Sequence, residues 1–121
     1  MSKTVLTVDD SRAMRDMLRH SLLAAGFRVL QAEDGLQGLA VLEHEQPDVI
    51  VTDINMPRMD GFGFIEAVRR DETRRGMPVL VLTTETDGEK KDRARIAGAT
   101  GWIVKPFDPA KLVEAIRRVS A

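Results

Sequence analysis

The sequence of 121 residues has the length of one compact domain, and its hydrophobic content of 43% is enough to build a core. The 18 basic and 19 acidic residues give a net charge of -1, which provides no general electrostatic attraction to nucleic acids or membranes. The absence of cysteine excludes disulfides and zinc–sulfur sites, and because neither a secretory signal nor a membrane-length apolar run is present, we expect a cytoplasmic protein.

Short apolar segments predict five β-strands. In chain order they lie at residues 4–8, 27–30, 49–51, 79–82 and 102–104. None of them alternates cleanly between apolar and polar residues. Continuous apolar runs of this length are typical of strands that are buried on both faces of a parallel sheet.

The segments between the strands predict amphipathic helices. Helical spacing recurs in two of them. The first has Met14, Met17, Leu18 and Ser21 at this spacing with Leu22 beside them, and the second has Leu112, Ile116 and Val119. Residues 84–97 give the weakest helical pattern, because they are rich in charged residues and contain few large apolar ones. We expect that helix to be loosely held and mostly solvated.

Helix boundaries are marked by capping patterns. Residues 34–37 (DGLQ) and 86–89 (TDGE) form capping boxes with the first residue of each as N-cap, and residues 108–109 form an Asp-Pro helix start. Gly26 and Gly98 stand where helices should end. Strand and helix therefore alternate five times, which predicts an α/β domain with a parallel sheet and helices on both faces.

Polar residues follow four of the predicted strands. Asp9 and Asp10 follow the first, Asp53 the third, Thr83 the fourth and Lys105 the fifth. In open α/β sheets, ligands bind beyond the carboxyl ends of the strands, where the strand order reverses. We therefore expect these side chains to lie together at one edge of the sheet.

The residue types at this edge indicate an acyl-phosphate site. Three crowded carboxylates repel one another unless a cation is present, and Mg²⁺ prefers such oxygen ligands. A lysine and a threonine hydroxyl beside the metal suit the oxygens of a tetrahedral phosphoryl group. An aspartate can itself act as the nucleophile toward phosphorus.

Four motifs carry a resemblance to a known family. They are VDDS (8–11), DINMPRMDG (53–61), VLTTE (81–85) and VKPF (104–107). In this order, each at a strand end, they resemble the receiver domain of two-component response regulators, and especially the stand-alone chemotaxis regulators. The resemblance spans essentially the whole chain. It implies a doubly wound, flavodoxin-like fold with strand order 2-1-3-4-5, and a single receiver domain over residues 1–121 with no output domain.

The resemblance also implies roles for individual residues in phosphorylation. Asp53 matches the phosphoacceptor, Asp10 a direct Mg²⁺ ligand and Asp9 a ligand that acts largely through water. Asn55 matches the residue whose backbone carbonyl completes the metal shell. The residues that match the loop shaping the site are Met56, Pro57, Asp60 and Gly61.

Further roles follow from the same resemblance. Thr83 and Lys105 match the pair that holds the phosphoryl oxygens, and Asn55 and Glu85 match the side chains that tune dephosphorylation. Trp102 falls at the position of the switch aromatic, where the family usually has the smaller tyrosine, phenylalanine or histidine. We expect Trp102 to lie partly exposed over the helix at 84–97, on the opposite face of the strand from Ile103. We also expect a cis peptide bond between Lys105 and Pro106.

The implied function is a phosphorylation switch that catalyses only its own phosphorylation and dephosphorylation. A histidine kinase would phosphorylate Asp53, and the face formed by the fourth helix, fifth strand and fifth helix would change to bind a partner. The favoured partner is the flagellar motor switch, with a phosphatase as a further partner and with the chain itself a monomer.

Several alternatives stay open at this point. The chain could act as a phosphate sink, serve another pathway, or be a binding scaffold that no longer uses phosphate. A Mg²⁺-dependent phosphatase of the haloacid-dehalogenase type also places an aspartate at a strand end. Such enzymes usually carry a second acid two positions later, where this chain has Asn55.

Overall fold

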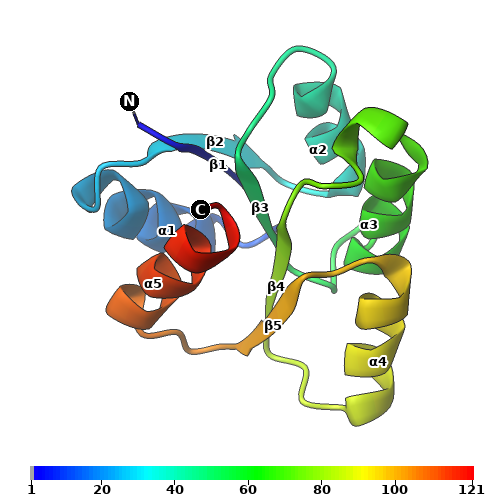
Figure 1. Ribbon diagram of the computed structural model, residues 1–121. Helices are drawn as coiled ribbons and strands as arrows, with labels where there is room; N and C mark the ends of the chain where they lie inside the picture. Colours follow the sequence, from blue (N-terminus) through cyan, green and yellow to red (C-terminus); the bar gives the residue numbers. More distant parts are fainter. Residues whose placement is uncertain (1) are drawn as a thin grey trace.

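Residues 2–121, which the computed structural model describes, are built around a five-stranded parallel sheet with helices on both faces (Figure 1). The strands are β1 (Thr4–Val8), β2 (Arg28–Ala32), β3 (Val49–Thr52), β4 (Val79–Thr83) and β5 (Gly101–Val104). Their order across the sheet is β2-β1-β3-β4-β5. This order confirms the predicted doubly wound fold, in which the strand order reverses at β1.

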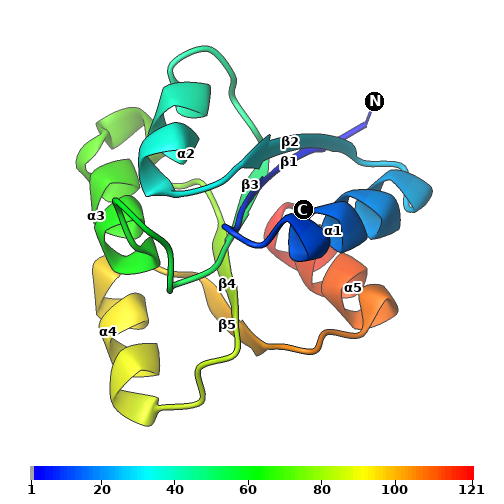
Figure 2. The same ribbon diagram turned by 180° about the vertical axis from the view of Figure 1, so that it is seen from behind.

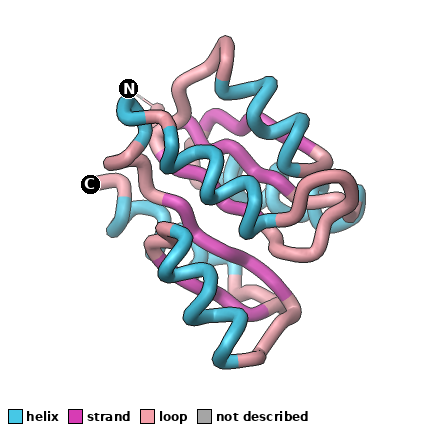
Figure 3. The backbone as a smooth tube through the Cα atoms, turned by 90° about the vertical axis from the view of Figure 1, so that its right-hand side faces the viewer, coloured by secondary structure: helices cyan, strands magenta, loops and turns pink. Residues whose placement is uncertain are grey.

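Helices form a layer on each side of the sheet. They are α1 (Arg12–Ala24), α2 (Gly35–Leu42), α3 (Gly61–Arg70), α4 (Gly88–Ala97) and α5 (Pro109–Val119), with a 3₁₀ turn η1 (Glu72–Arg74) after α3. The pair α1 and α5 covers one face, and α2, α3 and α4 cover the other (Figures 1 and 2). Figure 3 looks onto the layer of α2, α3 and α4, with the strands of the sheet behind these helices.

Each helix layer closes its own hydrophobic core against the sheet. On the α1–α5 side, Leu18, Leu22 and Ile116 are almost completely buried beside the sheet residues. On the other side, Phe64 and Ile65 of α3 form the centre of a second cluster. Full burial of each such side chain contributes roughly 1.5–3 kcal/mol to the free energy of folding. The strands are therefore fixed between two apolar layers, and their ends hold the site in place.

One helix differs from expectation in detail, and one agrees with it. Met17, assigned to the buried face of α1, is 55% exposed, because Leu18 and Leu22 lie one turn apart and define the buried stripe without it. Helix α4 agrees with the prediction, since only Ala94 among its residues is buried. It is the helix held least by apolar contacts.

The N-caps were predicted correctly for α2 and α5 but not for α4. Asp34 accepts the Gln37 N–H at 2.9 Å, while the Gln37 side chain reaches back to the Glu33 N–H. For α4 the N-cap is Asp87 and not Thr86, because the Asp87 carboxylate accepts the N–H of the second helical residue and the helix begins one residue later than the capping box predicts.

The ends of other elements also differ slightly from the prediction. Strand β2 runs from Arg28 to Ala32 instead of 27–30, because its pairing with β1 continues as far as Ala32. Helices α1 and α4 end just before the predicted glycines, at Ala24 and Ala97, and Gly26 and Gly98 have φ of 93° and 120°. Across residues 2–121, none of the helices combines the length and apolar character needed to span a bilayer.

Candidate functional site

The carboxyl ends of β1 and β3 bring three aspartates together. The Asp53 N–H donates to the Val8 carbonyl at 2.9 Å, so the first residue after β3 lies beside the end of β1. Carboxylate oxygens of Asp9, Asp10 and Asp53 all lie within 4.8 Å of one another. Asp9 is buried with 2% exposure, whereas Asp10 is exposed. The sequence-predicted acid cluster therefore exists at the edge where the strand order reverses.

Lys105 joins this cluster from the end of β5. Its Nζ donates to Asp9 Oδ2 and to Asp53 Oδ2, both at 2.8 Å, and its side chain is only 10% exposed. The bond from Lys105 to Pro106 is cis, as predicted. The sequence placed Lys105 at this edge, but the structure adds that one ammonium group bridges two carboxylates and partly offsets their repulsion.

Burial and pairing shift the pKa values within the cluster. Burial raises the pKa of Asp9, although the hydrogen bonds from Lys105 and from the Ser11 N–H act against it. Burial alone would lower the pKa of Lys105, but its hydrogen bonds to Asp53 and Asp9 outweigh this, so the pKa of Lys105 is raised and the lysine is charged at neutral pH. The site is thus a partly buried arrangement of acids with one fixed cation.

The donor set fits a hard divalent cation. Asp53 is oriented on both sides, because Oδ1 accepts the Ile54 N–H at 2.6 Å and Oδ2 accepts from Lys105. Asp10 extends the cluster on its exposed side. Carboxylate oxygens at such spacing are the ligands that Mg²⁺ uses, and the exposed side leaves room for water or phosphate oxygens. The residues present are therefore suited to Mg²⁺.

Thr83 lies at the end of β4 and is fully buried. Its hydroxyl oxygen accepts the Glu85 N–H at 3.3 Å. Glu85 Oε1 in turn accepts from the Asn55 side-chain amide and from Lys90, each at 3.1 Å. The hydrogen bond from Asn55, followed by the interaction with Lys90, lowers the pKa of Glu85. These contacts link the loops that follow β3 and β4 beside Asp53.

Lys90 is a site residue that sequence reasoning missed. The sequence predicts a mostly solvated helix over residues 84–97, yet the Lys90 ammonium pairs with Glu85. Side chains pair along a helix when they are three or four residues apart, whereas these two are five apart and Glu85 precedes α4. The charge signs at 85 and 90 are the only sequence signal for the pair, and they require the course of the loop to be known.

The loop between β3 and α3 is fixed by short backbone contacts. The Gly61 N–H donates to the Ile54 carbonyl at 2.8 Å, and a Cβ at position 61 would collide with the Asp53 carbonyl oxygen. Glycine is therefore required here by close approach to the backbone of Asp53. Asp60 caps α3 by accepting the Gly63 N–H at 2.9 Å.

An ion pair that the sequence did not predict closes the same loop. Arg58 has a left-handed backbone with φ of 65°, and its guanidinium contacts Asp34 Oδ2 through Nε at 2.6 Å and through Nη2 at 2.5 Å. The hydrogen bond from the Gln37 N–H lowers the pKa of Asp34, and Arg58 adds to this effect. The pair ties the loop that follows Asp53 to the start of α2.

Trp102 lies on the α4 side of β5, as its strand position predicts. It packs against the core cluster beneath α2–α4, whereas Ile103 packs against the opposite cluster. The indole is half-buried and borders a small pocket of about 170 Å³ that α4 also lines. The sequence-based expectation for its face and exposure is therefore confirmed.

The geometry is matched by a known family. Residues 5–117 match the family described as the response regulator receiver domain. The chain belongs to this family. As a receiver domain it is 40% identical to chemotaxis protein CheY-3 of Vibrio cholerae over 116 residues, which cover 95% of this chain and 89% of that protein.

Further similarities to receiver-containing proteins support this placement. The solved structure of chemotaxis response regulator CheY4 of Vibrio cholerae has a TM-score of 0.92 and 46% identity, and the match covers 98% of this chain and 99% of that one. The chain is 36% identical over 113 residues to RpaA of Synechocystis, described as a DNA-binding dual master transcriptional regulator. That match covers 93% of this chain but only 47% of RpaA, so this receiver domain corresponds to about half of that regulator.

Proposed function

We propose that this receiver domain is a phosphorylation-dependent signalling switch in which Asp53 accepts a phosphoryl group from a histidine kinase. The observation that carries the proposal is the position of Lys105, whose Nζ lies 2.8 Å from both Asp53 and Asp9 beside a third acid. Such a site combines a nucleophilic carboxylate with a fixed cation for the incoming phosphoryl oxygens. Membership of the receiver family supports the same conclusion.

In the proposed transfer, a carboxylate oxygen of Asp53 forms a bond to phosphorus while the bond from phosphorus to the kinase histidine nitrogen breaks. The released histidine takes up a proton. Lys105 and the Thr83 hydroxyl hold the phosphoryl oxygens. Asp9, Asp10, Asp53 and the backbone carbonyl of Asn55 would hold Mg²⁺, Asp9 largely through water. When bound, the metal neutralises charge on the carboxylates and the transferring group.

The output of the switch is a change at the face formed by α4, β5 and α5. Thr83 is drawn toward the phosphoryl group. The indole of Trp102, the switch aromatic, then changes its position in response. Asn55 and Glu85 beside the site tune the dephosphorylation rate. Phosphorylation acts here as a local charge change that biases a two-state element. The chain acts as a monomer, and its chemistry is limited to its own phosphorylation and dephosphorylation.

We favour a role in chemotaxis, with the flagellar motor switch as output partner and a phosphatase as a second partner. The support is the similarity to CheY-3 and CheY4 over nearly the full length of those chains. The similarity to RpaA leaves a second candidate, a receiver serving another pathway or acting as a phosphate sink. A pull-down of candidate partners with and without beryllofluoride, a mimic of the aspartyl phosphate, distinguishes the two.

The phosphoacceptor is tested by labelling with a small phosphodonor and Mg²⁺. We expect acid-labile, Mg²⁺-dependent labelling that Asp53→Asn abolishes. Asp60→Asn is the matched control, because asparagine is an equally good N-cap and α3 is preserved. Full labelling of Asp53→Asn would reject the assignment. Multiple turnovers of an aryl phosphate would instead favour the phosphatase alternative.

A further inference from the structure

A groove lined by arginines lies between α3 and α4. It has a volume of about 520 Å³, and its charged lining consists of Arg69, Arg70, Arg75 and Arg93 with Glu66 as the one acid among the lining residues. The whole chain has a net charge of -1, so positive charge is concentrated at this place. None of the lining residues belongs to the proposed phosphorylation site.

Arg69 supplies a fixed charge at the base of the groove. Its guanidinium donates to the Gly98 carbonyl at 2.8 and 3.1 Å and to the carbonyls of Arg74 and Arg75 at 2.7 and 3.2 Å. These acceptors lie at the ends of α4 and η1, where a cation is favourable. Partial burial lowers the pKa of Arg69. Within residues 2–121, no carboxylate pairs with this guanidinium, so its positive charge is not cancelled.

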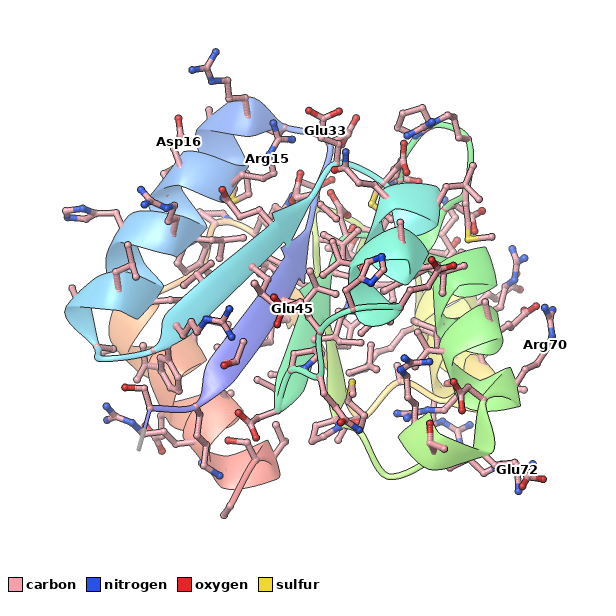
Figure 4. All side chains as sticks on the ribbon, turned by 90° about the horizontal axis from the view of Figure 1, so that it is seen from above. Arg15, Asp16, Glu33, Glu45, Arg70 and Glu72 are labelled. Atoms are coloured by element: carbon pink, nitrogen blue, oxygen red, sulfur yellow. The ribbon has the colours of Figure 1, made fainter. Side chains whose placement is uncertain are left out.

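Arg70 and Arg75 extend from the groove with only loose partners. Arg70 lies 4.0 Å from Glu66, and Arg75 lies 3.9 Å from Glu72. Their side chains are 76% and 68% exposed, and Figure 4 shows Arg70 pointing away from the body of the molecule. Exposed pairs at such distances stabilise the fold very little. Both guanidinium groups are therefore free to turn toward an anionic ligand.

Arg93 is held in place on the α4 wall. Its guanidinium carbon lies 4.1 Å above the centre of the Phe62 ring, and this aromatic contact orients the planar group. No carboxylate within the described part of the chain forms an ion pair with Arg93. A preorganised guanidinium with unused donors is suited to bidentate recognition of carboxylates.

The groove also has an exposed apolar side chain. Ile96 of α4 is 79% exposed and lines the groove beside the arginines. A ligand that only supplied negative charge would leave Ile96 in water. A ligand that combines carboxylates with one apolar side chain would pair with the arginines and cover Ile96 together.

We propose that this groove binds an acidic peptide segment of a partner protein, with an apolar side chain placed among its carboxylates. Charge complementarity argues for the acidic segment, and Ile96 argues for the apolar residue. Nucleic acid is a poorer match. The groove exposes an aliphatic side chain and not the aromatic platforms on which single-stranded bases stack, and the rest of the surface has no basic excess.

The proposal is tested with a short fluorescein-labelled peptide of glutamates with one central leucine. Anisotropy titration at low salt should show saturable binding. The double variant R75Q/R93Q should lower the affinity by at least about tenfold. The control R95Q/R118Q removes the same charge from exposed arginines outside the groove and should leave the affinity within about twofold. Arg69 is left intact because its bonds hold the ends of α4 and η1.

The apolar contact is tested by a double-mutant cycle. Ile96→Ser should weaken binding by about threefold or more, and replacing the peptide leucine by serine should cause the same loss. Combining the two changes should weaken binding no further than either change alone. When the peptide is added to the unmodified protein, the backbone amide NMR signals that shift should belong to α3, η1 and α4. This measurement needs no variant.

Three outcomes overturn the proposal. One is that R75Q/R93Q and R95Q/R118Q lose the same amount of peptide affinity. Another is a set of peptide-induced shifts centred away from the groove. The third is that an oligonucleotide binds more tightly than the peptide and that R75Q/R93Q weakens this binding. That result would assign the groove to nucleic acid.

Discussion

The side-chain amide of Asn55 donates a hydrogen bond to Oε1 of Glu85 at 3.1 Å, which joins the loop after β3 to the loop after β4. Lys90 binds the same oxygen at 3.1 Å. The three side chains link the loop that contains Asp53 to the loop after β4 and to α4. We therefore propose that α4, through Lys90, contributes to the control of water access to the proposed phosphoaspartate.

Removing Lys90 should loosen this link. In Lys90→Ala, Glu85 loses its cationic partner and the loop after β4 gains mobility, so the attacking water reaches the phosphoaspartate more easily. We expect the rate of dephosphorylation to rise by about threefold. Lys91→Ala is the matched control, because the neighbouring exposed lysine forms no ion pair within residues 2–121. A rate constant for loss of label that is identical in both variants would contradict this role for Lys90.

Substitution of Gly61 should disturb Asp53 directly. A methyl group at position 61 meets the Asp53 carbonyl oxygen and Cα of Ile54, so Gly61→Ala forces the backbone apart. We expect a loss of roughly 1–3 kcal/mol in the free energy of unfolding, together with weaker phosphorylation. Gly63→Ala is the control, because a Cβ there meets its nearest atoms at the ordinary distances of 3.4 and 3.5 Å. Urea denaturation of both variants provides the measurement, and equal midpoints would refute the argument.

The pair of Asp34 and Arg58 should contribute to acid sensitivity. The folded pKa of Asp34 is lowered, first by the Gln37 N–H and then by Arg58, so the unfolded state binds this proton more tightly. Its stabilisation is therefore fully present above the unfolded pKa of about 3.9 and is lost as the pH falls through the lower folded value.

Asp34→Asn tests this contribution. Asparagine preserves the N-cap but cannot ionise, so the variant should lose stability at neutral pH and show a shallower decline below pH of about 4. Chemical denaturation at a series of pH values measures the slope. The exposed Asp16→Asn on α1 serves as the control. A wild-type slope in Asp34→Asn would show that the Asp34 proton is not involved.

The acid cluster should destabilise the metal-free protein. Lys105 bridges Asp9 and Asp53, but no basic side chain among the described residues pairs with Asp10. Asp10→Asn should therefore raise the melting temperature in chelator by about 2–4 °C, by relieving repulsion. The same variant should gain less from added Mg²⁺ than the wild type. An unchanged or lower melting temperature in chelator would show that Lys105 already balances the cluster.

The fold and the position of the site follow from local sequence features. Continuous apolar runs indicate buried parallel strands, and Asp34 and Asp108 mark helix starts by capping. Once the strands are parallel, Asp53 and Lys105 must lie at the same edge although 52 residues separate them. Topology alone thus brings the main site residues together.

The specific side-chain pairings could not be predicted in the same way. The contact from Arg58 to Asp34 depends on a left-handed backbone at Arg58, a conformation that few residues other than glycine adopt. The contact from Lys90 to Glu85 depends on the path of a loop. These details are set by tertiary geometry and leave little pattern in the sequence.

Trp102 should report the switch, and it is the only tryptophan in the chain. The register pairs Trp102 with Val81, and Thr83 lies two residues farther along β4 on the same face of the sheet. Because Thr83 is fully buried, its movement toward a phosphoryl group would open space near the indole. The half-buried ring also borders the small pocket that α4 lines, and we compare this position with one turned inward toward the space that Thr83 would leave.

Steady-state fluorescence with beryllofluoride and Mg²⁺ decides between these positions. If the bulky indole turns inward, water is excluded and its emission should shift to the blue, while Asp53→Asn should show no shift. If the indole is too large for the space, the spectrum stays unchanged and activation must pass through the loop that begins after Thr83 and includes Glu85. An unchanged spectrum together with partner binding that still responds to beryllofluoride would remove Trp102 as the moving part and leave Asp53 phosphorylation as the switch.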